Sequence, residues 1–542
     1  MSIFEFQTKV KKVIDDLKAL TTELGLGNTG VEYKIISELF TYKFLNDKCM
    51  FLLKKYVEEN NIENIEKITE DEYEDFIMLN LGTMAVIEKE DLLFNLYNKI
   101  NVSDDMNIDE IFDQVLENIN NNENNEDYKI KTATGETHNL FEPLNSYIND
   151  KKKTKILAKR TISILNDTSF ENMFKEGNTF DFFSTIFEYL IQDYNKDSGK
   201  YAEYYTPSFA GDIIAKILVG KETNLVEKSL YDAAAGSGTL LMRLKNLIGE
   251  DNCTIYSQDI SQKSTNFLRL NLILNNLTSS LGNIIEGNTL SDPQHLEDGK
   301  LKKFDFIVSN PPFKVDFSNI VKDLEGDQYN RFFAGIPSIP PTKKDSMAIY
   351  LMFIQHIIAS LKDNGKAALV LPTGFCTAQS KIEKAIREHL IENNMLSGVV
   401  DMPSNIFANT GTSVSILFID KSKTDTNVIL VDATKLGKKV KADSGQKTEL
   451  SQEEQQRIVD VSIARENVED MAILVENEKI KENGYSFKAG QYFEHKVEKL
   501  DVDFDTRMKE LSSNLFVQMN ESVKLNEIIK SNLEVLGYGE KR

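Results

Sequence analysis

Residues 229–242, Ser-Leu-Tyr-Asp-Ala-Ala-Ala-Gly-Ser-Gly-Thr-Leu-Leu-Met, decide the fold class of this chain. An apolar strand over 229–233 leads into a turn with two glycines, Gly236 and Gly238, and a helix is predicted to begin near Thr239. Glycine lets the backbone turn sharply and lets a ligand approach it closely, and the first turn of a helix offers free N–H groups. The small Ala-Ala-Ala run and the absence of a Walker Lys-Ser/Thr pair argue against a phosphate loop. The stretch predicts a strand–turn–helix unit that holds a cofactor, or a tight turn without a ligand.

Short apolar runs alternate with helical patterns around and after this turn. The predicted strands cover 229–233, 254–258, 304–309, 366–371, 396–401 and 414–419, and a short hairpin-like strand, 428–432, follows the last of them. Strands that alternate with helices indicate a mostly parallel sheet with helices on both faces. The fold class is therefore α/β and Rossmann-like.

Helical patterns dominate both ends of the chain. We divide it into a helical N-terminal domain (1–165), an α/β cofactor-binding domain (166–475) and a helical C-terminal region (476–542). In the N-terminal part, Ile35, Ile36, Leu39, Phe40 and Phe44 form an apolar stripe at helical spacing, and the Asn-rich stretch 117–127 is predicted to be an exposed loop. The last stretch carries apolar residues near helical spacing, which fits a helix packed on its own domain or a helical arm that binds a partner.

The composition constrains the setting in which the chain works. No run of about 18 apolar residues appears, and the N-terminus lacks a signal-peptide pattern, so we expect no membrane span and a cytoplasmic location. Cys49, Cys253 and Cys376 match no metal-ligand spacing, nor do the five histidines, so no metal is expected. The net charge is −22, whereas contacts to nucleic-acid phosphates need Lys and Arg. If the chain binds nucleic acid, either its basic surface is local or a partner chain makes most of the contacts to nucleic acid. The alternative is that the acidity only serves solubility.

An acidic residue follows the next strand along the chain. Asp259 comes directly after the strand 254–258, more than 20 residues beyond the glycine turn. An acidic residue at this place in an α/β unit can accept hydrogen bonds from ribose hydroxyls. The alternative is an aspartate that only stabilises the start of a helix.

The most specific motif is Asn310-Pro311-Pro312-Phe313, which follows the apolar strand 304–309. Two consecutive prolines fix the backbone and remove two N–H donors. The side-chain carbonyl of Asn310 and the backbone carbonyl of Pro311 remain as acceptors that can face one planar amine, and Phe313 can stack on the ring that bears this amine. The motif predicts a site that holds an aromatic exocyclic NH2 group while its nitrogen attacks a methyl group; the alternative is a Pro-rich loop at a strand end without this role.

Together these motifs resemble those of the modification subunits of type I restriction–modification systems, which are N6-adenine DNA methyltransferases. Further segments extend the resemblance over about 168–492, and the helical ends match only in general character. These segments are Gly199–Pro207, Gln258-Asp-Ile-Ser261, Arg269-Leu-Asn271-Leu, Asp401–Phe407, Thr410-Gly-Thr and Gly484-Tyr-Ser-Phe487.

The resemblance implies a class I methyltransferase domain over 166–475 that uses S-adenosylmethionine. Asp232, Gly236 and Gly238 would line the methionine end of this cofactor, and Asp259 would bind its ribose. The whole predicted cofactor site comprises Tyr205, Thr206, Pro207, Asp232, Gly236, Ser237, Gly238, Thr239, Asp259, Asn288, Thr289 and Leu290, where Tyr205, Thr206 and Pro207 would close over the cofactor. One position departs from the family, because Asn288 stands where an aspartate usually faces the adenine. Its side-chain oxygen can still accept a hydrogen bond, but it lacks the charge.

The function implied by the resemblance is methyl transfer to the exocyclic amine of an adenine that is flipped out of duplex DNA. The expected partners are a specificity subunit that chooses the site and a restriction subunit. Two copies of this chain are expected for each specificity subunit. A methyltransferase acting on a glutamine amide or an RNA base stays open as an alternative, because the same Asn-Pro-Pro core serves planar amides. A non-catalytic cofactor-binding scaffold is a second alternative, and the intact Asn-Pro-Pro-Phe counts against it.

Overall fold

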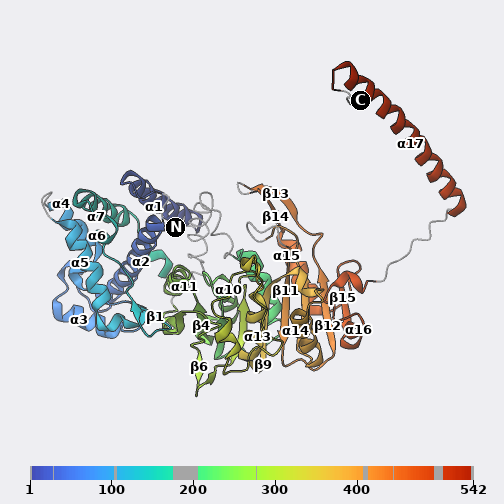
Figure 1. Cartoon of the computed structure of the whole chain (residues 1–542). Coiled ribbons are helices and arrows are strands. Elements are labelled where there is room, and N and C mark those ends of the chain that lie inside the picture. Colours follow the sequence, from blue (N-terminus) through green and yellow to red (C-terminus); the bar gives the residue numbers. More distant parts are fainter. Residues whose placement is uncertain are drawn as a thin grey trace. The chain divides into compact units, whose positions relative to one another are not determined.

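The computed structural model of the chain describes residues 3–27, 30–102, 107–174, 206–275, 277–406, 413–442, 445–493 and 504–538. These residues fall into two compact units, 1–492 and 493–542. The first unit holds the N-terminal helices and a large sheet with its helices, and the second holds one long helix (Figure 1). None of the described helices is both long enough and apolar enough to cross a membrane.

The N-terminal part is helical, as predicted. The stripe through Ile35, Ile36, Leu39, Phe40 and Phe44 is buried in one core with the neighbouring helices, because residues at this spacing share one face of a helix. The helices of this part are α1 (Ile3–Glu23), α2 (Gly30–Glu59), α3 (Glu70–Leu79), α4 (Leu93–Val102), α5 (Ile108–Asn121), α6 (Leu144–Tyr147) and α7 (Lys151–Asn166).

The exposed loop predicted over 117–127 is wrong. The last turn of α5 and a 3-10 helix, Glu123–Tyr128, occupy this stretch. Asn125 is buried, and its side chain accepts a hydrogen bond from the Val86 amide (2.8 Å) and donates to the Val86 carbonyl (2.9 Å). A buried side chain that satisfies another segment's backbone is a long-range contact, which the polar composition of the stretch does not reveal.

An eleven-stranded sheet forms the centre of the first unit. Its order is β15-β12-β10-β11-β9-β8-β3-β4-β5-β1-β2, and two further pairs, β13–β14 and β6–β7, stand apart from it. The strands are β1 (Ile130–Thr132), β2 (Thr137–His138), β3 (Lys228–Asp232), β4 (Cys253–Asp259), β5 (Ile284–Glu286), β6 (Leu296–Glu297), β7 (Lys300–Leu301), β8 (Phe304–Ser309), β9 (Leu361–Pro372), β10 (Leu396–Asp401), β11 (Val414–Asp420), β12 (Asn427–Asp432), β13 (Lys438–Ala442), β14 (Gly445–Glu449) and β15 (Ala472–Glu476).

All six predicted strands are present, and the α/β fold class is confirmed. The central strands β8, β10 and β11 are buried over several consecutive residues, which requires cover on both faces of the sheet. Helix α9 packs against α10 and α15, while α13 packs against α14, and α14 against α16. The helices of this part are α9 (Ser208–Val219), α10 (Thr239–Ile248), α11 (Gln262–Leu274), α12 (Val321–Glu325), α13 (Tyr350–Ser360), α14 (Lys381–Glu392), α15 (Gln452–Ala464) and α16 (Asn477–Glu482).

The sheet differs from the prediction at both of its ends. The strand at 428–432, β12, forms no hairpin with β11; it pairs in parallel with β10 and antiparallel with β15. At the other end, β1 and β2 from the N-terminal part extend the sheet, with β1 parallel to β5. The helical patterns of the N-terminal sequence hide these two short strands. The domain boundaries at 165/166 and 475/476 stay predictions.

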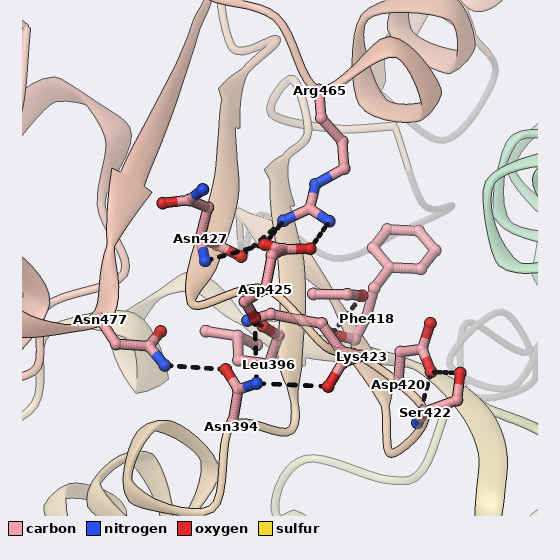
Figure 2. A network of polar contacts seen from close by, with 11 residues as sticks. Asn394, Leu396, Phe418, Asp420, Ser422, Lys423, Asp425, Asn427, Arg465 and Asn477 are labelled. Atoms are coloured by element: carbon pink, nitrogen blue, oxygen red, sulfur yellow. Dashed lines mark hydrogen bonds and ion pairs between the residues drawn. The ribbon is translucent and has the colours of Figure 1, made fainter.

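The amino ends of β10 and β12 and the carboxyl end of β11 are joined by a polar network (Figure 2). Arg465 at the end of α15 donates to both carboxylate oxygens of Asp425 at 2.8 Å and to the Asn427 carbonyl at 2.6 Å. Asn394 donates to the Asp425 carbonyl at 3.0 Å and accepts from the side chain of Asn477 at 2.9 Å. The network fixes the loop between β11 and β12, at the edge of the sheet opposite the carboxyl ends of its parallel strands.

The second unit contains helix α17 (Phe504–Val535), none of whose residues is buried. Large apolar side chains along it are exposed, among them Leu511, Leu515, Leu525, Ile529 and Leu533. Among the described residues of this unit, the apolar stripe of this 32-residue helix has no packing partner.

Candidate active site

Three parallel strands bring the predicted motifs to one edge of the sheet. β3 lies between β4 and β8, and all three run in the same direction. Asp232 and Asp259 are the last residues of β3 and β4, and Asn310 directly follows β8. Ligands of open α/β sheets bind at the carboxyl ends of such strands, so the fold places these groups where a ligand is expected.

The glycine turn has the backbone that its sequence predicts. Gly236 (φ 54°) and Gly238 (φ 80°) are both in the left-handed region, which side chains with a Cβ rarely adopt. A Cβ at Gly238 would lie 2.2 Å from Leu268 Cδ1 on α11, so the turn also needs glycine for close packing. The side chain of Asn271, also on α11, donates to the Ser237 carbonyl at 3.2 Å.

Asp259 links this turn to the next strand. One of its carboxylate oxygens accepts from the Gly236 amide at 2.9 Å and the other from the Ser261 amide at 2.8 Å. Burial raises the pKa of Asp259, and these two backbone donors oppose the increase. A carboxylate has about four acceptor positions, so two remain for a ligand.

Asp232 is a buried carboxylate at the end of β3. It accepts from the hydroxyl of Ser309 at 2.7 Å and from the Ala234 amide at 3.0 Å. Burial raises its pKa to about 7, and the charge of Asp259 adds to the increase. The carboxylate therefore favours a cationic or hydrogen-bond-donating ligand, which would stabilise its charged form.

Asn310 and the turn after β3 line one small pocket. Its lining comes from the segment before α9, the end of β3, the turn that follows it, the start of α10 and the residue after β8: Thr206, Asp232, Ala234, Ala235, Ser237, Thr239, Leu240 and Asn310. The amide nitrogen of Asn310 donates to the hydroxyl of Thr206 at 3.0 Å. This bond leaves the side-chain oxygen of Asn310 as the acceptor for a ligand amine.

Phe313 is half-buried, and its ring lies edge-on to Tyr350 of α13, with centroids 6.5 Å apart. Tyr350 in turn lies edge-on to Phe375, at 6.2 Å. Tyr350 therefore lies against both Phe313 and Phe375. Sequence reasoning missed Tyr350 and Phe375 because they lie 37 and 62 residues further along the chain.

Asn288 lies two residues after β5, and its side chain has a local role. Its oxygen accepts from the Leu290 amide at 3.0 Å and the Ser291 amide at 3.4 Å. The next residue, Thr289, is buried and donates to the Ala233 carbonyl at 2.7 Å, so the loop is held against the end of β3. The amide nitrogen of Asn288 is thus the atom that remains for a ligand.

Arg331 holds the loop after β5, and sequence reasoning missed it. It is 2% exposed. Its guanidinium donates to the carbonyls of Thr289 (3.1 Å) and Leu290 (2.6 Å) and pairs with Asp327 at 2.9 Å. It thereby ties the loop after β5 to the segment that follows the Asn-Pro-Pro-Phe motif. A single arginine in a loop carries no sequence signal of this role.

His356 continues the connection from Arg331 to the central strand. Burial lowers the pKa of His356 well below its usual range, so the ring is neutral. Arg331 can only donate, so Nδ1 of His356 accepts from it at 3.2 Å, and Nε2 carries the proton that is donated to the Tyr231 hydroxyl at 3.1 Å. These buried hydrogen bonds fix the position of the loop after β5 relative to the segment that follows the Asn-Pro-Pro-Phe motif.

The remaining predicted residues are placed as follows. Pro207 immediately precedes α9, and Leu290 is fully buried. Tyr205 lies outside the described residues, as do Phe407, 410–412 and most of the segment 199–207. Within the described part of the chain, no group of three or more His, Cys, Asp or Glu side chains could hold a metal ion.

Comparison with known proteins places this chain in a family. Residues 178–501 match the family model of the N-6 DNA methylases, which is more than half of the chain. The chain belongs to this family. Membership confirms the predicted class of enzyme, an adenine-specific DNA methyltransferase.

The similar proteins are methylase subunits of type I restriction enzymes, as the motifs predicted. The MpnII methylase subunit of Mycoplasma pneumoniae is 26% identical over 455 residues, which cover 78% of this chain and 80% of that protein. The MjaIX methylase subunit of Methanocaldococcus jannaschii is 29% identical, with 69% and 67% covered. The crystal structure of the methyltransferase subunit of a type I system from Streptococcus thermophilus has a TM-score of 0.70 at 20% identity and covers 91% of this chain and 100% of that one. This last likeness shows the shared fold.

Proposed function

We propose that the chain transfers a methyl group from S-adenosylmethionine to the exocyclic amine of an adenine in duplex DNA, as the catalytic modification subunit of a type I complex. The observation that carries this proposal is the single pocket at which Asp232, the glycine turn and Asn310 meet. A donor and an acceptor of a methyl group must lie in direct contact, and a pocket shared by both motifs provides this proximity.

The residues present fit the proposed cofactor. Asp232 is a buried carboxylate suited to the cationic methionine end, and the free acceptor positions of Asp259 suit ribose hydroxyls. Ile260, directly after Asp259, is 70% exposed and offers an apolar surface for a flat base. The cofactor would supply an electrophilic methyl group on a sulfonium centre.

The other residues would hold the adenine. The oxygen of Asn310 and the carbonyl of Pro311 would accept the two hydrogens of the amine, which orients its nitrogen lone pair. Phe313, supported by Tyr350, would stack on the ring. Taking the base out of the duplex costs roughly a few kcal/mol, and these contacts would offset part of that cost.

The partners and the alternatives follow from the same proposal. A specificity subunit would choose the site, with two copies of this chain per specificity subunit, and a restriction subunit would complete the complex. To test the function, S-adenosylmethionine with a labelled methyl group is incubated with the chain and duplex DNA, RNA or protein, with and without the specificity subunit, and the labelled product is identified. Label in DNA adenine supports the proposal; label in RNA or protein, or none at all, favours the amide or RNA methyltransferase or the non-catalytic scaffold.

The first prediction concerns the cofactor pocket. Gly236→Val should weaken the binding of S-adenosylmethionine by about 100-fold, because a β-branched residue at φ 54° is strained by ~1–2 kcal/mol and its side chain would occupy ligand space. Isothermal titration of the folded protein measures the affinity. Gly299→Val is the matched control, since Gly299 also has a positive φ (72°) but lies between β6 and β7, away from the pocket. Equal affinities in wild type and Gly236→Val would contradict the assignment of this pocket.

The second prediction concerns Asn288. Asn288→Asp should tighten cofactor binding by about fivefold, since the atom left for a ligand becomes a carboxylate oxygen, and a charged acceptor binds an amine more strongly. The local bonds to Leu290 and Ser291 need only an oxygen and should persist. Asn283→Asp, at the other end of β5, adds the same charge as a control. A marked loss of affinity at position 288 would mean that the Asn288 amide donates to the cofactor, or that it lies elsewhere.

A further inference from the structure

Lysine is concentrated on one hairpin of this acidic chain. Residues 435–447, Lys-Leu-Gly-Lys-Lys-Val-Lys-Ala-Asp-Ser-Gly-Gln-Lys, contain five lysines and one acidic residue, whereas the whole chain has a net charge of −22. Lys435, Lys438 and Lys439 are exposed and form no ion pair with any described residue. Lys447 lies 3.5 Å from Glu449. The hairpin is therefore a local positive surface.

The hairpin is anchored to the sheet at its base. The amide of Ala433 donates to the Asp401 carbonyl at 2.9 Å, and the amide of Thr448 donates to the Asn405 carbonyl at 3.0 Å. The Gly437 amide donates to the carboxylate of Glu454 at 2.8 Å. Glu454 also forms the capping box at the start of α15. The two strands β13 and β14 thus start from a fixed base.

This base lies at the same edge of the sheet as the catalytic motif. β8 is parallel to β9, β9 and β10 are each antiparallel to β11, and β10 is parallel to β12. The carboxyl ends of β8, β10 and β12 therefore lie at one edge of the sheet, and the hairpin β13–β14 extends from this edge (Figure 1). From β12 to β8 there are four strand spacings, roughly 19 Å at about 4.8 Å each.

We infer that this hairpin binds the phosphate backbone of the duplex whose adenine enters the active site. The inference rests on the proposed function. At about 3.4 Å per base pair, a distance of roughly 19 Å puts the contacted phosphates five to six base pairs from the target adenine.

The side chains of the hairpin fit phosphate better than bases. Its described apolar residues are Leu436, Val440 and Ala442, and the stretch 435–447 contains no aromatic residue on which an unpaired base could stack. Lysine contacts to phosphate position a duplex without reading its sequence. Such a contact suits a subunit that leaves the choice of site to a partner, and it resolves how a chain of net charge −22 approaches DNA.

The experiment compares two double variants of the full chain. Lys438→Gln with Lys439→Gln removes two charges from the hairpin. Lys221→Gln with Lys300→Gln removes two exposed lysines from the opposite edge of the sheet, where α9 ends and β8 begins. The affinity for a labelled duplex of arbitrary sequence is measured over a series of salt concentrations, for the chain alone and with the specificity subunit. Thermal melting and cofactor titration verify that both variants fold.

The hairpin variant should reduce the slope of log affinity against log salt by about 2, since each lost phosphate contact contributes ~0.9. The control should keep the wild-type slope. In a second duplex that contains the methylated site, bound with the specificity subunit, neutral methylphosphonate links five and six base pairs from the target adenine should weaken wild-type binding and have no further effect on the hairpin variant. An unchanged slope in the hairpin variant, or no DNA binding by the wild type at any salt concentration, would overturn the inference. A changed slope without methyl transfer by the wild type would instead refute the proposed function and leave the hairpin contact standing.

Discussion

Asn310→Ala should reduce the turnover of methyl transfer by about 1,000-fold and leave the binding of S-adenosylmethionine unchanged. The amide oxygen of Asn310 is free for a ligand because its nitrogen is bonded to Thr206. The contact with the amine strengthens as its nitrogen gains positive charge in the transition state, and loss of one such preorganised polar group typically costs 10²–10³ in rate. Single-turnover kinetics with labelled cofactor and a DNA substrate measure the effect, and calorimetry measures cofactor binding.

Two further variants separate catalysis from structure. Thr206→Val keeps the Asn310 amide but removes the acceptor that orients it, so turnover should fall by only about tenfold, the worth of one hydrogen bond. Asn393→Ala removes an asparagine at the end of α14, far along the chain from the motif, and should have no effect on turnover. Near-normal turnover by Asn310→Ala would end the proposed mechanism, whereas an equal loss of cofactor binding would make Asn310 part of the cofactor site.

The sequence predicts the centre of the fold well because its signals there are local. The strand before Asp232, the positive φ angles at Gly236 and Gly238 and the strand before Asn310 all follow from residues within a few positions of one another. Neighbouring parallel strands have their carboxyl ends at the same edge of the sheet, so polar residues that follow such strands lie near one another. The meeting of Asp232 and Asn310 at one pocket was therefore predictable in outline.

The parts that sequence reasoning missed depend on contacts between distant segments. Arg331 reaches back about 40 residues to the carbonyls of Thr289 and Leu290, and backbone acceptors leave no trace in the sequence. Asn125 is polar, yet it is buried because it satisfies the backbone of Val86. β12 pairs with β10 rather than with its sequence neighbour β11, and strand pairing is decided by the packing of the whole sheet.

Deletion of all residues after Asp503 should abolish assembly with the specificity subunit and, with it, methylation of a defined site. The apolar residues of α17 are exposed and none is buried. In water, most helical stability in proteins comes from packing of an apolar face against a partner, and at about 1.5 Å per residue this helix offers a stripe of roughly 48 Å. We propose that the specificity subunit covers it. Cofactor binding should persist, because the pocket belongs to the first compact unit.

Point variants test the same stripe without removing the helix. Leu515→Asp with Ile529→Asp puts two charges on the apolar face, since residues 14 apart lie nearly four turns apart on one side of a helix. Ser513→Asp with Asn520→Asp adds the same charge on the opposite side. Co-elution with the specificity subunit and methylation of duplex DNA should be lost in the first pair and kept in the second. The full-length chain alone should bind DNA weakly and without sequence preference, because its charge of −22 opposes approach to phosphate everywhere except at local basic surfaces. If the truncated chain still assembles, or the lone chain methylates a defined site efficiently, then α17 is not the docking helix or site choice lies within this chain.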